Sequence, residues 1–216
     1  LIKKSSLPEI EPEKQNNSET SGKVKKLVFA DPYLVLGVLA IFFHVGSQVI
    51  AIDTIIGYAQ FMGMDLIEAK AFSILYDDVY FDSYFIGVLL IPRVLSQRTA
   101  LQICTVFGKL FFFGVLLLDF NVDILGHQSN VSIWFLCLMG LPNALIYAGI
   151  WPLAIHGLGK FTNLGSSMMV MALCGNAFLP MIYGYFADQL GARMAYWILI
   201  PCIFVFDTFF RSKDIK

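Results

Sequence analysis

Three residues with hydrogen-bonding or aromatic side chains recur every four positions within a long apolar segment: Asn143, Tyr147 and Trp151. Side chains four residues apart share one face of a helix, so the three form a slowly turning stripe. An aromatic ring can stack on the C–H face of a pyranose, while an amide hydrogen-bonds its hydroxyl groups. The stripe therefore predicts a sugar-binding surface. The alternative is that the two aromatic residues only fill space between helices.

Three more polar residues in apolar segments are candidates for the same site. Gln48 and His44 are four residues apart, and Asn176 follows a glycine in another apolar segment. The Gln48 amide both donates and accepts hydrogen bonds, which suits a hydroxylated ligand. A hydrogen bond that joins two helices is an equal alternative for Gln48, and we favour it for His44.

Asp53 places a carboxyl group in the same apolar segment as His44 and Gln48. Ionisable residues within a membrane commonly have a functional role, so Asp53 is a candidate for coupling or gating. Its position toward the outer end of the segment also fits an ordinary surface acid. No metal site, cofactor or enzyme active site is expected, because the three histidines are scattered without the spacing of metal ligands.

These residues lie in a chain with the composition of an integral membrane protein. Of its 216 residues, 57% are hydrophobic and 14% are charged, which is more apolar surface than a soluble core can bury. The one basic cluster, Lys23, Lys25 and Lys26, directly precedes an apolar segment and is a topology signal, so no nucleic-acid partner is expected. The four cysteines have no CxxC spacing and are expected to be free, buried thiols.

A membrane-spanning helix needs about 20 mostly apolar residues, and six segments qualify. Short connections join them, which predicts an all-α integral membrane protein, a bundle of six transmembrane helices with antiparallel neighbours. The predicted spans cover residues 33–62, 72–92, 99–118, 131–156, 164–187 and 194–210.

The second of these spans is the least apolar, because it contains Asp77, Asp78 and Asp82. A carboxylate near the centre of the bilayer costs about 2.5 to 3.5 kcal/mol on insertion scales. Either the acids lie outside the membrane and a short span runs from about residue 81 to residue 94, or they line water. Asp77 and Asp78 are about 100° apart around a helix and point in different directions, so we do not favour a cation site.

The distribution of basic residues predicts the orientation in the membrane. With a cytoplasmic N-terminus, the inside segments hold twelve lysine and arginine residues and the outside loops hold two, Lys70 and Arg193. This asymmetry predicts that both termini are cytoplasmic. In the last outside loop, Asp188 is expected to be a solvated turn residue or to pair with Arg193.

Three regions follow from this division of the chain. Residues 1–30 are polar and cannot bury enough apolar surface to fold alone, so they are expected to form a disordered cytoplasmic linker. Residues 31–210 are expected to form the six-helix transmembrane unit, and residues 211–216 a cytoplasmic tail.

Five stretches of the sequence occur in a recognisable order between Leu7 and Cys202. They are LPEIEPE, LVLGVLAIFFHVGSQVIAIDTIIGYAQ, IGVLLIPRVLSQRTALQIC, NALIYAGIWPLAIHGLGKFTNLGSS and GYFADQLGARMAYWILIPC. In this order the chain resembles the C-terminal half of the bacterial glucose/galactose permeases, in the fucose-galactose-glucose:proton symporter family of the major facilitator superfamily. Two features depart from that pattern: the acidic second span, and Gln48 in a region where an acidic residue is common.

The resemblance implies a twelve-helix transporter in the bacterial inner membrane, with sugar bound between two six-helix halves. This chain would then need a missing N-terminal half, which in the family carries most of the acids that couple proton uptake. The expected function is transport of a glucose- or galactose-type hexose by alternating access, coupled to a cation, with the proton as the expected cation. The alternative is a non-functional or structural fragment of a split or incomplete transporter gene.

Overall fold

The structure is a computed structural model that describes residues 32–91, 96–124 and 127–212. The expected linker over residues 1–30 and most of the expected tail over residues 211–216 lie outside the described residues. Within them the chain is almost entirely helical. Its elements, in order, are α2 (Pro32–Phe61), α3 (Leu66–Leu90), α4 (Gln97–Leu117), β1 (Asn121–Ile124), β2 (His127–Asn130), α5 (Val131–Leu138), α6 (Gly140–Ile155), η1 (Gly159–Phe161), α7 (Thr162–Met171), η2 (Ala172–Cys174), α8 (Gly175–Leu190), α9 (Ala192–Ala195), η3 (Tyr196–Leu199) and α10 (Ile200–Ser212).

The helical, membrane-spanning character predicted from the sequence is confirmed. Among the described residues, four helical segments are long and apolar enough to cross a bilayer: Pro32–Phe61, Thr99–Leu117, Val131–Ile155 and Thr162–Leu190. A shorter apolar helical segment covers Ala192–Val205. The second predicted span corresponds to α3, whose 25 residues are sufficient in length but include the three aspartates.

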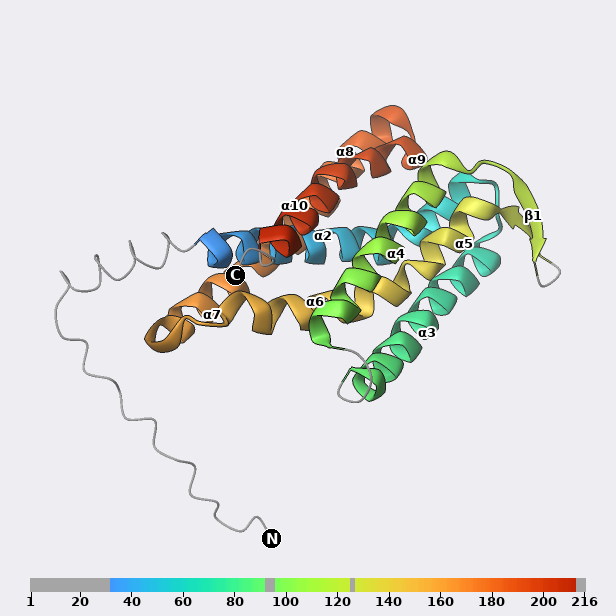
Figure 1. Ribbon diagram of the computed structural model, residues 1–216. Helices are drawn as coiled ribbons and strands as arrows, with labels where there is room; N and C mark the ends of the chain where they lie inside the picture. Colours follow the sequence, from blue (N-terminus) through green and yellow to red (C-terminus); the bar gives the residue numbers. More distant parts are fainter. Residues whose placement is uncertain (1–31, 92–95, 125–126, 213–216) are drawn as a thin grey trace, which may run out of the picture.

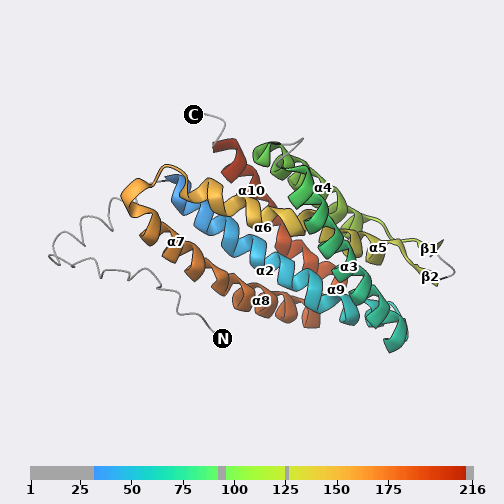
Figure 2. The ribbon, with the colours of Figure 1, turned by 90° about the horizontal axis from the view of Figure 1, so that it is seen from below.

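Helix α2 runs through the middle of the bundle and packs against α3, α6, α8 and α10 (Figures 1 and 2). It crosses α8 closely. A Cβ atom added to Gly46 would meet the Gly175 carbonyl oxygen, and one added to Gly175 would meet the Phe42 carbonyl oxygen. The two backbones are therefore in direct contact at this crossing, as small residues allow in membrane bundles.

The fourth and fifth predicted spans are interrupted helices. Helix α5 ends at Leu138 and α6 begins at Gly140, two residues before Pro142, which has no N–H to continue the hydrogen bonds of the preceding turn. Gly140 lies against α3, because an added Cβ atom would be 2.8 Å from the Tyr76 carbonyl oxygen. In the fifth span the short 3-10 turn η2 separates α7 from α8.

A two-stranded antiparallel hairpin, which we did not predict, joins α4 to α5. Asn121 pairs with Asn130, and Ile124 pairs with His127. The predicted all-α class is therefore correct for the membrane-length elements and wrong for this connection. Strand β1, NVDI, alternates polar and apolar side chains over only four residues, and strand β2, HQSN, is polar throughout, so the pattern that marks a half-buried strand is weak here.

Arg193 connects the short helix α9 to the end of α4. Its Nη1 lies 2.6 Å from Asp119 Oδ2, and its Nη2 donates hydrogen bonds to the carbonyl oxygens of Leu118, at 2.7 Å, and Leu116, at 3.2 Å. Asn130 Nδ2 also donates to Asp119 Oδ1, at 2.7 Å. The Asn130 hydrogen bond and the Arg193 charge hold the pKa of Asp119 below its usual range. Arg193 thus pairs with Asp119, whereas Asp188 is exposed.

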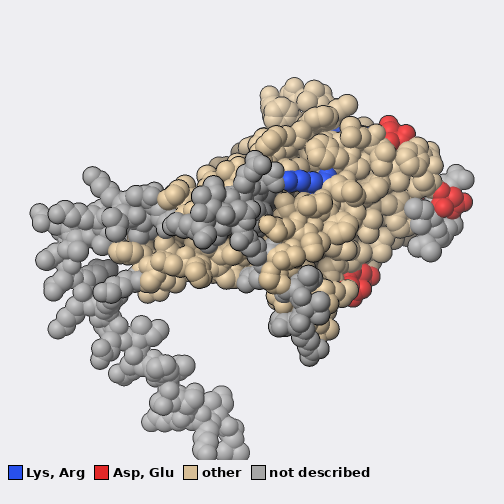
Figure 3. Space-filling model, viewed as in Figure 1, with Lys and Arg blue, Asp and Glu red and all other residues tan. Residues whose placement is uncertain are grey.

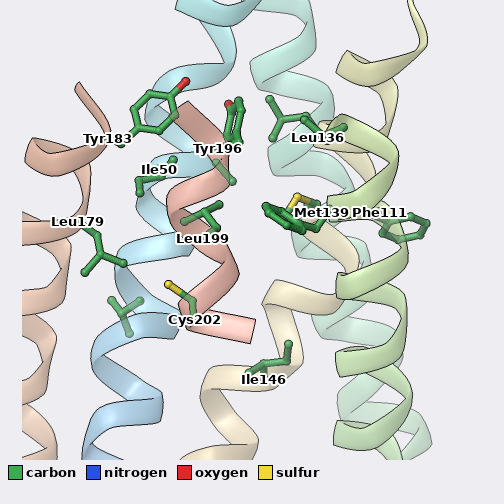
Figure 4. Packing of buried hydrophobic residues seen from close by; sticks show 14 of the residues in the cluster. Ile50, Phe111, Leu136, Met139, Ile146, Leu179, Tyr183, Tyr196, Leu199 and Cys202 are labelled. Atoms are coloured by element: carbon green, nitrogen blue, oxygen red, sulfur yellow. The ribbon is translucent and has the colours of Figure 1, made fainter. Parts of the chain in front are cut away.

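The buried core lies along α2, where side chains from most of the other helices meet (Figure 4). Ile50, Leu179, Leu199 and Cys202 pack together between α2, α8, η3 and α10. Many large apolar side chains remain exposed on the outer faces of the helices, as expected for a protein that is surrounded by lipid.

Candidate functional site

Asn143 lies near the start of α6 and is only 6% exposed. Its Nδ2 donates a hydrogen bond to the Tyr76 hydroxyl of α3, at 3.0 Å. The close approach of Gly140 to α3 brings the two side chains within reach. The amide therefore joins two helices, and one such bond does not exhaust its two N–H donors and its carbonyl acceptor. Its contact with sugar stays a prediction.

The other two members of the stripe are less buried than Asn143. Tyr147 and Trp151 are half-buried on α6, with ring centroids 6.2 Å apart and ring planes tilted by 53°. Each ring therefore keeps part of its surface open. Stacking on a sugar requires an open ring face, so this arrangement is compatible with the predicted role.

His44 and Asn143 line a small cleft among α2, α4, α6 and α10, together with Lys109. The cleft has a volume of about 40 Å³, which is enough for a few water molecules. Ligand pockets usually measure about 300 to 1,000 Å³, so this cleft alone does not hold a hexose. His44 is 1% exposed, as expected for a residue that packs between helices.

A second cleft, of about 280 Å³, lies between α3, α4 and α6. Its lining includes Tyr84, Leu101, Leu145 and Gly149 and is almost entirely apolar. Recognition of a sugar needs several amide or hydroxyl groups that converge on the ligand. This cleft lacks them along the described lining, so its chemistry does not suit a hexose.

The remaining candidates lie on α2 and α8. Gln48 is half-buried on α2, two residues after Gly46, and Asn176 is exposed on α8, next to Gly175. The contact between Gly46 and Gly175 therefore brings these two parts of the chain together. Asp53 is exposed, more than one helical turn farther along α2 than Gln48.

The seven predicted residues are thus distributed over three helices, and of them only His44 and Asn143 line either of the two clefts. His44 and Asn143 are inside the bundle, whereas Asp53 and Asn176 are on its surface. The described residues also contain no group of three or more histidine, cysteine or acidic side chains that could hold a metal ion.

Sequence reasoning missed Tyr76, which is fully buried and holds the Asn143 amide. It also missed a tyrosine cluster between the ends of several helices. The Tyr196 hydroxyl lies 2.6 Å from Thr54 Oγ1, and the Tyr58 hydroxyl donates to Ser132 Oγ at 2.9 Å. A tyrosine inside an apolar run is a signal for such a partner, because a buried hydroxyl needs a hydrogen bond.

Comparison with known proteins gives sequence relatives that are named as sugar transporters. The chain is 28% identical over 172 residues to a glucose/galactose transporter of Brucella abortus, an alignment that covers 79% of this chain and 40% of the relative. It is 26% identical over 216 residues to a putative glucose/galactose transporter of Helicobacter pylori, with coverage of 97% and 49%. The chain therefore spans half or less of the length of these relatives, which are transporters and not enzymes. No family model matches the chain.

Two solved structures share its fold. The structure of the fucose:proton symporter of E. coli has a TM-score of 0.77 at 23% identity, and the match covers 92% of this chain and 47% of the symporter. A structure described as the major facilitator superfamily transporter FucP in the outward conformation gives a TM-score of 0.78 at 23% identity, covering 91% and 47%. The predicted resemblance is confirmed: the chain has the fold of part of a major facilitator superfamily transporter and is similar in sequence to proteins named as sugar transporters.

Proposed function

We propose that the chain is the C-terminal six-helix half of a hexose transporter of the bacterial inner membrane, with both termini in the cytoplasm. Its six spans are α2, α3, α4, α5 with α6, α7 with α8, and α9 with η3 and α10. The missing N-terminal half completes the sugar site, and the two halves alternate access to a hexose of the glucose or galactose type. Uptake is coupled to a proton.

One observation carries this proposal: an alignment over 97% of this chain covers only 49% of a named glucose/galactose transporter. The structural match has the same proportion, at 92% of this chain and 47% of a fucose:proton symporter. A chain of this kind supplies one wall of a site between two halves. That explains why the candidates Gln48, Tyr147, Trp151 and Asn176 are partly or fully exposed and line neither of the two clefts.

The test is sugar binding and counterflow with labelled hexoses in liposomes that contain the complete two-half protein. Loss of a stacking ring or a buried amide bond costs about 1 to 3 kcal/mol, so Trp151→Ala should weaken binding roughly 5-fold to 150-fold. Trp151→Phe keeps a ring face and should retain part of the affinity. Phe113→Ala, on an exposed part of α4, is the matched control and should bind sugar like the parent.

The alternative is a non-functional or structural fragment of a split or incomplete gene. It predicts that no six-span coding segment precedes the chain in frame and that joining such a half produces no sugar counterflow. Equal sugar affinity of the parent and Trp151→Ala, at the same abundance in the membrane, would refute the assignment of the α6 stripe without refuting transport.

A further inference from the structure

Helix α3 carries three exposed acids at the middle of a membrane-length helix. Its buried side includes Tyr76, Ser83 and Gly87, through which it packs against α5 and α6. Asp77, Asp78 and Asp82 are all exposed. In both ribbon views α3 lies at an edge of the bundle, and acidic side chains reach the surface over it (Figures 1 to 3).

Asp78 and Asp82 share a face with apolar residues. They are one helical turn apart, and Phe81 and Phe85 lie between and beside them on the same side of α3. Phe81 is 60% exposed and Phe85 is 64% exposed. We call these four residues the α3 acidic face. Exposure to lipid is favourable for the two phenylalanines but costs free energy for the two carboxylates. Lipid alone is therefore an unsuitable environment for this face.

The bond between Tyr76 and Asn143 indicates the depth of the α3 acidic face, because Asn143 is the central residue of the candidate span Val131–Ile155. Asp78 is the central residue of the 25-residue helix Leu66–Leu90, so it has about 18 Å of helix on either side. The hydrocarbon core is about 30 Å thick. A short aspartate side chain at that position cannot extend to the headgroups, unlike a lysine or an arginine.

We propose that the α3 acidic face docks against the other six-helix half, which presents lysine or arginine side chains to Asp78 and Asp82 at mid-membrane depth. The inference rests on the proposed function, since it needs that half to exist. The chain matches 49% of a relative and 47% of a related structure, so the length that remains in those proteins is sufficient to supply it. The phenylalanines pack against its apolar helices, and its cations satisfy the carboxylates.

Site-specific photocross-linking in the complete protein tests where the face lies. The photoreactive residue p-benzoylphenylalanine replaces Phe81 or Phe85, which leaves both aspartates in place. The expected adducts are with the other half, within about one helical turn of a lysine or an arginine. The control replaces Phe113, which is 44% exposed on α4, with p-benzoylphenylalanine, and this variant should give lipid adducts. Adducts of Phe81 and Phe85 with lipid only, or with a second copy of this chain, would overturn the proposal.

A charge experiment tests the carboxylates themselves. With the two halves expressed as separate tagged chains, Asp78→Asn combined with Asp82→Asn should lower co-purification of the other half by roughly 10-fold, because a buried cation loses its partner. Asp123→Asn, an exposed acid in the hairpin, should have no effect. Asp82→Lys should abolish co-purification, and changing the cross-linked base to aspartate should restore it. Unchanged co-purification in the double variant refutes the electrostatic role.

These readouts are separate from those for the proposed function. Cross-links and co-purification without sugar counterflow would support the docking surface and refute hexose transport. Sugar counterflow together with lipid adducts at Phe81 and Phe85 would support hexose transport and refute the docking surface.

Discussion

At the scale of single residues, the bond between Asn143 and Tyr76 changes how the α6 stripe is understood. Sequence reasoning treats Asn143, Tyr147 and Trp151 as equivalent, because all three lie on one helix face. The structure separates them: Asn143 is buried and bonded across to α3, whereas the two rings are half-buried. We therefore expect Trp151 to affect mainly sugar binding and Asn143 to affect stability as well.

A double-mutant cycle measures the bond between Asn143 and Tyr76. Hydrogen bonds between membrane helices contribute about 0.6 kcal/mol on average and about 1.7 kcal/mol at most, so Asn143→Ala and Tyr76→Phe should show coupling in this range. The measurement is the free energy of unfolding in mixed micelles. Tyr84→Phe, at an exposed tyrosine on the same helix, is the control and should show no coupling to Asn143→Ala. Strict additivity of the first pair would mean that the bond does not form in the membrane.

At the scale of elements, apolar runs predict the membrane helices well and predict little about how they bend or meet. The predicted span 33–62 lies one residue from α2 at each end, because a long apolar run bounded by polar residues has few alternatives. The break at Met139 and the hairpin were missed. The break has a local signal in Pro142, which the prediction of one continuous span over residues 131–156 did not use, whereas the short strands contain few apolar residues and give little signal. The Asn143–Tyr76 pair is 67 residues apart in sequence, so no local signal reveals it.

The crossing of α2 and α8 is predicted to tolerate no side chain at Gly175. An added Cβ atom would collide with the backbone oxygen of Phe42, so Gly175→Ala must separate the two helices, at a cost of about 1 to 3 kcal/mol in the free energy of unfolding. Gly184→Ala, on the same helix and with nothing near the added atom, is the matched control and should leave stability unchanged or raise it. Thermal unfolding of the detergent-solubilised chain gives the comparison. Equal melting temperatures for the two variants would contradict the close crossing.

The contact of Asp119 with Arg193 and Asn130 is predicted to make stability depend on pH. Because the pKa of Asp119 is lower in the folded protein than in the unfolded chain, its contribution is present at neutral pH and is lost as the pH falls through the folded pKa. Asp119→Asn should remove this part of the dependence when melting is followed from about pH 7 to about pH 3. Asp123→Asn should keep it. The size of the effect is limited by the exposure of the Asp119 side chain, which is 66%.

At the scale of the whole molecule, the first and last described helices and the hairpin mark opposite ends of the bundle. The start of α2, the end of α10 and the turn at η1 lie toward one end in Figure 1, and the hairpin lies at the other. The charge asymmetry predicts that the first end is cytoplasmic. Single cysteines at Asn163 and at Asp123, in a chain without its native cysteines, should therefore react with an impermeant maleimide from the inside and from the outside, respectively. Labelling of position 163 from outside would overturn the proposed orientation.

The last prediction is that this chain alone inserts into a membrane but does not transport sugar. In the proposed function the candidate residues on α2, α6 and α8 supply one wall of the site, and the two clefts described above are either too small or too apolar for a hexose. Binding energy for the other side of the ligand must come from a second six-helix unit, and so must the cations that the α3 acidic face needs. Proteoliposomes with the purified 216-residue chain should show uptake of labelled glucose and galactose no higher than empty liposomes. The complete protein is the positive control. Uptake by the chain alone would require two copies to form the site, and its disappearance on dilution in lipid would identify such a dimer.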